Sequence, residues 1–574
     1  MIKYIYISLI TTALVSINCV ARGESLYSRY QLPPIERMPA QNQGYKLMQA
    51  SQVMNRLYSL PVTPSEIENP DNYVKALRGK ILQGVAHLLG KNSQNDIIFS
   101  GSSTMELDRF IQLTPADHAV FVSKKHIRFN GTVHLRNGVT LKGNKSVITD
   151  ANARDTVFLV HGVENTAVSG FIVDGAGVGI YVADSRRFVF RDMKLKGCRR
   201  GLIIQGRSEY GLIDYIEADG SYYGGILIAG PAHYIMVKNS VIRNGKDYFN
   251  WHAGLVMTDT PLKDFIKSES ADKTFSVSAV STSISAAAET VPYSNVIQGC
   301  TFYENKASGI YTDGGAGNVI VSNVMENNDK EGMCLDGGSS FNVVQGNLIK
   351  GNGFRRRQTD EDLSKDFVSG FGRMDDGSAV AKLPGISLDN TAYNIISENT
   401  IKENAGDGIK MVRSCFRNII IFNNILSNNR GQNKVFHFFG VLIGNAPSDS
   451  NSEKGLYDFL PCYENIIAYN VICGQHYSGV LLDFDAAFND IYNNTIFKFL
   501  NLPVEAASRE FNSIVDNVIP TGNNTKYQIE YKKRKRLFFA MMILLIVLNV
   551  LVAVIVRRYI SRKDSKGSII MRNF

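Results

Sequence analysis

The sequence contains a single tryptophan and only 15 prolines among its 574 residues, and charged residues make up only 20%. Together with 44% hydrophobic residues, these low values exclude a largely disordered chain and leave enough apolar side chains for a large core. The seven cysteines include no CxxC pair, which excludes the common cysteine-based metal and redox motifs. Glycine occurs 49 times and tyrosine 26 times, a composition typical of a chain rich in strands and turns.

The net charge of +9 is concentrated at one end of the chain. Eleven of the 62 lysines and arginines, but only one of the 53 acidic residues, lie within residues 532–574. That segment therefore carries +10, and the rest of the chain carries −1. A body without net charge has no field that would attract a polyanion, so we expect no binding to nucleic acid.

The first residues predict export. Lys3 precedes an apolar run, and small residues follow near Ala21, a pattern typical of a signal peptide over residues 1–21. An uncleaved first anchor is the alternative interpretation. Cleavage and export would place the body of the protein on the periplasmic or extracellular side.

A second apolar segment predicts a membrane anchor. Residues 537–556 are twenty in number with only Asn549 polar, which is about the length that spans the hydrocarbon core of a bilayer. Basic residues flank both sides, so we expect a basic linker at 521–536, a single transmembrane helix, and a short basic cytoplasmic tail at 557–574.

The centre of the chain is periodic. A Gly-Ile-x-apolar pattern, in which Leu, Val or Met can replace Ile, recurs with a basic spacing of 22–24 residues at Gly179, Gly201, Gly225, Gly254, Gly309, Gly332, Gly385, Gly408, Gly440 and Gly479. Asparagine followed by two β-branched residues forms a second series, at Asn295, Asn318, Asn342, Asn394, Asn418 and Asn465, and a further asparagine follows five residues after all but the first. Repeats of this length with several short strands predict a solenoid whose coils pair strand to strand. Its asparagines would stack at a corner and bond the backbone and each other.

These repeats resemble the right-handed parallel β-helix of pectate lyases, mannuronan epimerases and related carbohydrate-acting proteins. The resemblance covers residues 120–520 and implies an all-β, right-handed parallel β-helix solenoid. Ahead of it, Tyr45–Tyr58 and Asn72–Leu89 have the sequence of helices. We interpret residues 22–119 as an N-terminal helical cap that covers the open end of the solenoid.

Three insertions interrupt the repeat. Ser268–Thr290 is rich in serine and alanine, Phe354–Lys382 is densely charged in both signs, and Asn445–Leu460 is polar. Insertions in solenoids usually gather on one face, which is often the binding face.

Side chains that could take part in catalysis or binding follow the repeated glycine. Because side chains alternate along a strand, the second and fourth residues after each glycine should point outward. Aspartate occupies the fourth position in three successive coils, with a tyrosine and a lysine at the second position nearby and an arginine just beyond. These candidates are Asp313, Asp336, Asp389, Tyr311, Lys410 and Arg413.

Carboxylates on neighbouring strands repel one another, so they need a bound cation or a raised pKa. The first outcome would make Asp313, Asp336 and Asp389 a calcium site, and the second would make them general acids and bases. The alternative interpretation is a solvated face, because aspartate is also a common turn residue at the end of a strand.

Two carbohydrate-acting families resemble this arrangement. Calcium-dependent pectate lyases combine an acidic cluster with a basic Brønsted residue, which implies that Lys410 and Arg413 contact a uronate carboxylate or transfer protons. Polygalacturonases resemble the chain at Tyr311-Thr-Asp-Gly314, at Asp375-Asp376 and at Gly408-Ile-Lys410, but their Gly-His-Gly motif is missing, as is the Asp-Pro-His-Asp of the alginate epimerases.

Three further residues are candidates for substrate binding. Trp251 beside His252 forms a potential pair for sugar stacking and proton transfer, with an ordinary loop as the alternative interpretation. Arg373 lies in the charged insertion.

The sequence thus predicts a membrane-anchored, exported β-helix protein that acts on an acidic polysaccharide. We expect a lyase or epimerase in exopolysaccharide synthesis or modification at the cell envelope, in contact with the synthesis machinery. A polygalacturonase-like glycoside hydrolase is the second interpretation, and a non-catalytic polysaccharide-binding or assembly protein is the third. A structural fibre or adhesin is disfavoured by the membrane anchor.

Overall fold

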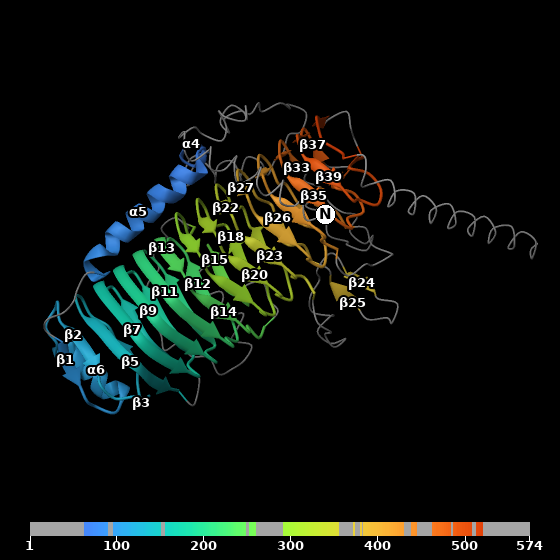
Figure 1. Cartoon of the computed structure of the whole chain (residues 1–574). Coiled ribbons are helices and arrows are strands. Elements are labelled where there is room, and N and C mark those ends of the chain that lie inside the picture. The colour runs from blue at the N-terminus through green and yellow to red at the C-terminus, as the bar shows by residue number, and fades with distance from the viewer. Residues whose placement is uncertain are drawn as a thin grey trace, which may run out of the picture.

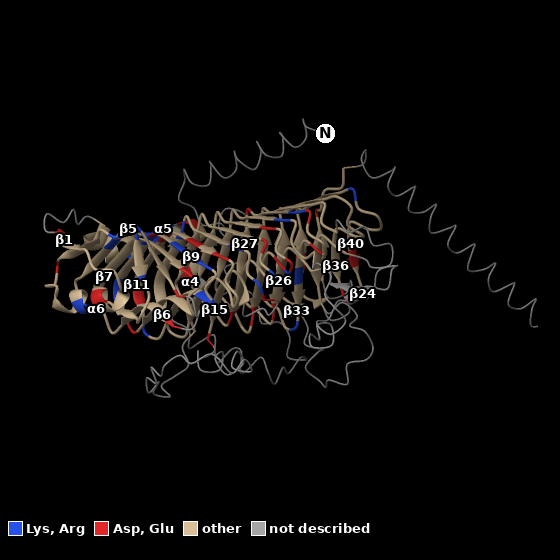
Figure 2. Cartoon of the chain, turned by 90° about the horizontal axis from the view of Figure 1, so that it is seen from below, with Lys and Arg blue, Asp and Glu red and all other residues tan. Residues whose placement is uncertain are grey.

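The computed structural model describes residues 62, 64–89, 96–150, 155–247, 252–259, 291–354, 371–373, 379–381, 383–429, 438–444, 462–483, 486–507 and 512–520. Their strands stack into an elongated solenoid, with each coil lying on the preceding one (Figure 1). Figure 2 shows lysines and arginines interspersed with acidic residues along its length.

A 13-stranded parallel sheet, here called sheet B, forms one side of the solenoid. In order, its strands are β4 (Val133–His134), β6 (Thr156–His161), β8 (Val178–Ala183), β10 (Arg200–Gln205), β12 (Ile226–Ala229), β15 (Leu255–Thr258), β18 (Ile310–Asp313), β21 (Met333–Asp336), β26 (Ile386–Asp389), β29 (Ile409–Val412), β32 (Val441–Ile443), β36 (Val480–Leu482) and β40 (Val504–Ala506). All the glycines of the predicted repeat lie at the start of one of these strands, which confirms the repeat.

A 24-stranded sheet, here called sheet A, forms the remaining sides. Its strands are β1 (Asp96–Phe99), β2 (Ala119–Val122), β3 (His126–Arg128), β5 (Thr140–Thr149), β7 (Glu164–Asp174), β9 (Arg186–Lys196), β11 (Glu209–Asp219), β13 (His233–Lys238), β14 (Val241–Arg243), β16 (Val296–Gln298), β17 (Thr301–Tyr303), β19 (Val319–Val321), β20 (Val324–Glu326), β22 (Val343–Gln345), β23 (Leu348–Lys350), β27 (Ile395–Ser397), β28 (Thr400–Lys402), β30 (Ile419–Ile421), β31 (Asn424–Leu426), β34 (Ile466–Ala468), β35 (Val471–Cys473), β38 (Asp490–Tyr492), β39 (Thr495–Phe497) and β41 (Ser513–Val515). Two small pairs complete the strands of the described residues: β24 (Phe371–Arg373) with β25 (Ala379–Ala381), and β33 (Cys462–Tyr463) with β37 (Ala486–Ala487).

The coils stack in register, so equivalent positions of the repeat lie above one another. Ile310 of β18 pairs with Met333 of β21, which pairs with Ile386 of β26. All three side chains are fully buried in the core of the solenoid. The register transfers the sequence repeat directly into rows of like side chains along the solenoid axis.

Stacked asparagines hold the corners of the coils, as predicted. In the first row, Asn318 accepts hydrogen bonds at Oδ1 from the backbone N–H (3.0 Å) and the Nδ2 (3.1 Å) of Asn295, and the same pattern repeats from coil to coil. A second row contains Asn323 and Asn347. The structure also shows a third row that the sequence analysis did not single out, formed by Asn305, Asn328, Asn352, Asn404 and Asn428.

The long N-terminal helix does not cover the end of the solenoid, so this part of the predicted cap is wrong. Helix α4 (Pro64–Ile67) and helix α5 (Pro70–Leu89) follow one another, and α5 packs along the side, against β7, β9, β11 and β13 (Figure 1). Val74, Leu77, Ile81 and Val85 form its buried stripe. The apolar stripe of a helix can be buried equally well against the outer face of a sheet or against the open end of a solenoid. The sequence does not distinguish these two positions of the helix.

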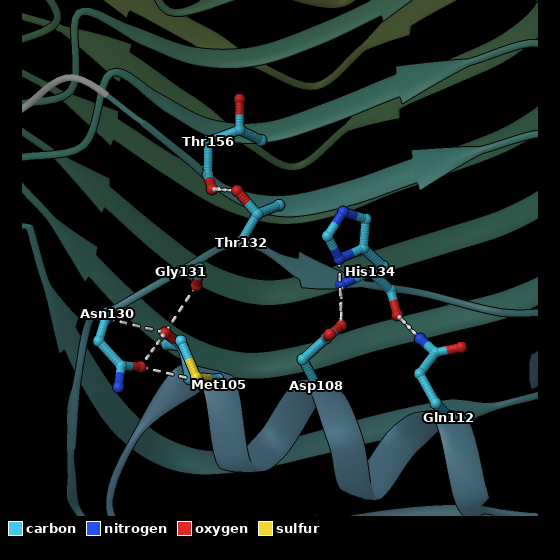
Figure 3. A network of polar contacts seen from close by, with 9 residues as sticks. Met105, Asp108, Gln112, Asn130, Gly131, Thr132, His134 and Thr156 are labelled. Carbon is cyan, nitrogen blue, oxygen red and sulfur yellow. Dashed lines mark hydrogen bonds and ion pairs between the residues drawn. The ribbon is translucent and has the colours of Figure 1, made fainter. Parts of the chain in front are cut away.

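Helix α6 (Thr104–Leu113), which the sequence analysis did not predict, covers that end instead. Leu107 and Ile111 are fully buried in the core cluster of the solenoid. Asp108 accepts a hydrogen bond from the backbone N–H of His134 in β4 (2.7 Å), and Gln112 Nε2 donates to the His134 carbonyl (2.9 Å), so polar contacts fix the helix across the first coil (Figure 3).

No helix within the described ranges is both long and apolar enough to cross a bilayer. The predicted signal peptide at 1–21, the predicted span at 537–556 and the predicted helix Tyr45–Tyr58 lie outside the described residues.

Candidate functional site

Acidic and basic side chains form a polar region over four neighbouring strands on the outer face of sheet B. Ile203, Leu227 and Val256, at the second repeat position of β10, β12 and β15, are at most 3% exposed and belong to an apolar cluster separate from the solenoid core. On the other side of the polar region, Leu442 of β32 is 2% exposed. Between them, β18, β21, β26 and β29 present what we call the sheet B site: Tyr311, Asp313, Glu331, Asp336, Asp389, Asp407, Lys410 and Arg413.

Asp313 and Asp336 are direct register partners on β18 and β21, so their Cα atoms lie about 5 Å apart. Gly337, with φ +61°, makes room for this arrangement, because a Cβ at that position would overlap the Asp313 carboxylate. The backbone N–H of Gly337 donates to Asp336 Oδ1 (2.7 Å), which fixes the orientation of the second carboxylate.

Tyr311 is buried beneath the two aspartates, with 4% exposure. Its hydroxyl group donates a hydrogen bond to Asp336 Oδ2 (3.2 Å), one coil further on. Burial, reinforced by the Asp336 carboxylate, raises the pKa of Tyr311, so the phenol stays neutral and acts as a donor. Near the N-terminal end of sheet B, Tyr181 has a neutral partner at the same diagonal position: Gln205 Nε2 donates to the Tyr181 hydroxyl group.

Asp389 is held by Arg413. Arg413 Nε donates to Asp389 Oδ1 (2.6 Å), and Nη2 contacts Oδ2, so the guanidinium group binds both carboxylate oxygens. Positive φ angles at Arg413 and Ser414 (51° and 62°) form a turn after β29 at the base of this side chain. Burial raises the pKa of Asp389 to about 6, and Asp336 adds to the shift, although the hydrogen bond from Arg413 opposes it.

Lys410 brings a second cation to the site. It pairs in register with Ser387 of β26 and is partly buried. Its ammonium group lies close enough to Asp389 and Asp407 to lower the pKa of both carboxyl groups against the effect of burial. A cation therefore stands among carboxyl groups from two coils.

The residues directly before the repeated glycines were missed by the sequence analysis. Glu331 is 8% exposed and accepts a hydrogen bond at Oε2 from Ser308 Oγ (2.8 Å). Asp407 is 5% exposed, accepts from the backbone N–H of Phe439 (2.6 Å), and has its pKa raised to about 6 by burial. The signal that could have found them is the position before glycine, because that position also faces outward at the edge of sheet B.

Of the other predicted substrate-binding residues, only His252 has a side chain within the described part of the structure. His252 is 6% exposed, its ring lies 4.9 Å from that of Tyr223, and its Nδ1 is 3.3 Å from Asp247 Oδ2. It precedes β15, one coil before Tyr311. Trp251 lies outside the described residues, and for Arg373 the structure describes only the backbone, in β24.

One of the three predicted calcium ligands, Asp389, is paired with Arg413 in this structure. Both oxygens of Asp389 are engaged by Arg413, which leaves the register pair of Asp313 and Asp336, whereas calcium takes six to eight oxygen ligands. Across the described residues, no three His, Cys, Asp or Glu side chains come together in a group that could hold a metal ion. Calcium binding stays a prediction.

The insertions attach near the sheet B site, some at the start and some at the end of a sheet B strand. The first lies between Asp259, after β15, and Val291, and the second lies between Phe354 and Leu383, before β26. The third follows Gly444, after β32. Apart from Phe354 and the backbones of β24 and β25, the insertions lie outside the described residues.

The sequence matches the family described as "Right handed beta helix region" over residues 109–372 and 294–454, which together make up more than half of the chain. The chain belongs to this right-handed β-helix family. A comparison with curated proteins found no match.

Solved structures resemble the β-helix at low identity. The A-module of the Azotobacter vinelandii mannuronan C-5 epimerase AlgE4 is 13% identical, with a TM-score of 0.44, over 75% of this chain and 99% of its own. The bacteriophage CBA120 tailspike protein 3 is 8% identical (TM-score 0.43; 77% and 62%), and the Streptococcus pneumoniae surface adhesin PfbA is 13% identical (0.41; 74% and 92%). At these values the likenesses are no basis for assigning an activity, which has to be argued from the site.

The sheet B site of this β-helix combines groups suited to proton transfer with groups of positive charge. Asp389 and Asp407 have pKa values raised to about 6, so each exchanges a proton near neutral pH. Lys410 and Arg413 supply positive charge beside them. From β18 to β29 the site spans three inter-strand steps, or about 14 Å, which gives room for more than one sugar residue.

Proposed function

We propose that this β-helix acts on an acidic polysaccharide at the sheet B site, as a lyase or epimerase at a uronate residue. The supporting observation is the gathering of five carboxyl groups, a buried phenol and two cations on four neighbouring strands, beside the apolar positions of β10, β12, β15 and β32. Burying charged groups and placing like charges side by side both raise the free energy of the folded state. Such clusters are more frequent at functional sites than elsewhere.

Both reactions begin with removal of the proton from the carbon next to the uronate carboxylate. Arg413 and Lys410 would neutralise that carboxylate, and the electron pair left by the proton would be stabilised there. A lyase then breaks the bond from the neighbouring carbon to the glycosidic oxygen, whereas an epimerase returns a proton to the opposite face. Asp389 and Asp407 would exchange these protons, and the Tyr311 hydroxyl group would hold Asp336 in position.

The cellular setting of the proposal rests on the sequence. The apolar segments at 1–21 and 537–556 support export of the body and attachment by one helix. A membrane-attached enzyme on the exoplasmic side would meet an exopolysaccharide as it leaves the synthesis machinery, and its product would be a modified or trimmed polymer.

The test uses the full-length chain in detergent with polymannuronate, polygalacturonate and other acidic polysaccharides, with calcium and with a chelator. A lyase produces an unsaturated uronate that absorbs in the near ultraviolet, and an epimerase incorporates deuterium from heavy water without chain cleavage. New reducing ends without absorbance would identify the glycoside hydrolase instead. Binding without any of the three signals would identify a binding or assembly protein, and no binding would refute the proposal.

Variants connect the activity to the site. Asp313→Asn, Asp336→Asn, Asp389→Asn and Lys410→Ala should each abolish turnover. Removing one carboxylate of the repelling pair Asp313 and Asp336 should leave the melting temperature unchanged or raise it. Full activity in all four variants would remove the sheet B site from the mechanism.

A further inference from the structure

A polar cavity lies around the corner from the sheet B site, where the chain passes from sheet A into β15, β18 and β21. Its volume is about 300 Å³, at the lower end of the range for small-molecule sites. We call it the corner pocket. Asn244, Lys246, Glu304, Lys306, Asn327 and Asp329 supply its polar lining, from the connections after β14, β17 and β20.

The walls of the corner pocket are fixed by backbone hydrogen bonds. The N–H of Lys306 donates to the carbonyl of Gly245 (3.0 Å), and the N–H of Asp329 donates to the carbonyl of Asn305 (2.8 Å). Asn305 belongs to the third asparagine row, and its Oδ1 accepts from the N–H of Gly245 (3.1 Å). Because these hydrogen bonds fix the backbone of the pocket, the pocket is formed without a ligand. Binding therefore does not cost conformational entropy to order its backbone.

The charges of the pocket balance. Lys306 Nζ lies 2.9 Å from Asp329 Oδ2, and Lys246 and Glu304 add one charge of each sign. A cavity with no net charge has no general preference for an anion. Its ammonium, carboxylate and amide groups can both donate and accept, which suits the neighbouring hydroxyl groups of a sugar ring.

Two coils of the pocket, those of Lys306 and Asp329, also carry the first two strands of the sheet B site. Lys306 and Asp329 stand two residues before Ser308 and Glu331, which are joined by the 2.8 Å hydrogen bond, and Tyr311 follows on the first of these coils. From residue 306 to residue 313 the chain advances seven residues, or at most about 23 Å of extended strand. The pocket and Asp313 therefore lie within the reach of one oligosaccharide that crosses β18 and β21 transverse to the solenoid axis.

We propose that the corner pocket binds one sugar residue of the polysaccharide through its hydroxyl groups, so that the polymer crosses coils β18 and β21 instead of following the solenoid axis. This inference rests on the proposed function, because it takes the sheet B site as the place where the chain reacts. It predicts that affinity rises with oligosaccharide length until the chain reaches from the aspartates to the pocket.

The experiment measures binding of oligomannuronates and oligogalacturonates of two to eight residues to the full-length chain by calorimetry. Lys306→Ala and Asn327→Ala should weaken binding of the longer oligomers about tenfold, as expected for lost hydrogen bonds to a charged or amide group, and leave the short ones unchanged. Lys350→Ala is the matched control, because Lys350 is a similarly exposed lysine in an ion pair of similar length (3.0 Å, with Glu326) outside the pocket.

The outcomes separate the two proposals. Equal weakening at every length, or no weakening by either pocket variant, would overturn the corner pocket while turnover by the wild type still supports the sheet B site. Length-dependent weakening together with full turnover in Asp313→Asn, Asp336→Asn, Asp389→Asn and Lys410→Ala would instead support the pocket and remove the sheet B site from the proposed function. Wild-type binding that does not depend on length in either series would count against the transverse path.

Discussion

Asn347 offers the sharpest test of what holds the coils together. It is 1% exposed and makes four side-chain hydrogen bonds. Oδ1 accepts from the backbone N–H (2.8 Å) and the Nδ2 (3.0 Å) of Asn323, and Nδ2 donates to the carbonyl of Ile320 (2.8 Å) and to Asn399 Oδ1 (2.9 Å). Asn347→Ala removes all four and leaves the buried N–H of Asn323 without its acceptor.

The magnitude follows from that loss. An orphaned buried donor costs about 1–3 kcal/mol, and the remaining bonds contribute about 1 kcal/mol each. We therefore expect Asn347→Ala to lower the free energy of unfolding by about 4–6 kcal/mol. Asn517, near the C-terminal end of the same row, also accepts two bonds from its predecessor, Asn494, but it is only partly buried. Water can replace the lost partners there, so Asn517→Ala should cost about 1 kcal/mol or less.

Urea denaturation of both variants measures the difference. Because each coil contacts only its neighbours, hydrogen exchange should also show the loss of protection centred on the coil of Asn347 and its two neighbours. Equal losses in the two variants, or a loss below 1 kcal/mol for Asn347→Ala, would refute the view that the asparagine rows are a main source of stability.

Three further predictions concern pH, the site and the topology. Burial lowers the pKa of His476 to about 4, so the folded protein holds its imidazole neutral while the unfolded chain takes up a proton below pH 6.5. The free energy of unfolding should therefore fall by up to about 3 kcal/mol between pH 6.5 and 4. Denaturation of the wild type and His476→Asn at pH 7 and 4.5 should show this loss as a difference between the two proteins. Tyr311→Phe should reduce turnover while Tyr181→Phe, which breaks the equivalent contact with Gln205, leaves it unchanged; equal activities would remove the phenol from the mechanism. A periplasm-active reporter inserted at Ser281 should be active and one fused after Phe574 silent, and the reverse would overturn the predicted topology.

Much of the solenoid could be predicted because its determinants are local and repeated. The glycine series marks the start of sheet B strands, and the asparagine series marks the corners, since a buried amide at a tight corner needs the same partners in every coil. The location of α5 could not be predicted, because an apolar stripe records that a helix face is buried and not which surface covers it.

The site was predicted only in part for a similar reason. The repeat places Asp313, Asp336 and Lys410 on one face, since alternation follows from strand geometry. The contact between Arg413 and Asp389 depends on a turn with positive φ angles after β29, which no repeat position encodes. Asp407 stands before its glycine, where the chain bends into the strand and simple alternation no longer applies.

The asparagine rows also give the solenoid an electrical polarity. In every row the side-chain amide accepts from the preceding coil and donates to the following one, so all the amide dipoles point the same way, with their negative ends toward the N-terminus. Hydrogen bonds in such a chain polarise one another and strengthen together. Two of the rows continue to Asn512 and Asn517 in the last described coil. The C-terminal end of the solenoid therefore receives the positive ends of two aligned dipole stacks, much as the N-terminus of an α-helix does, and is the end of the molecule better suited to meet an anion.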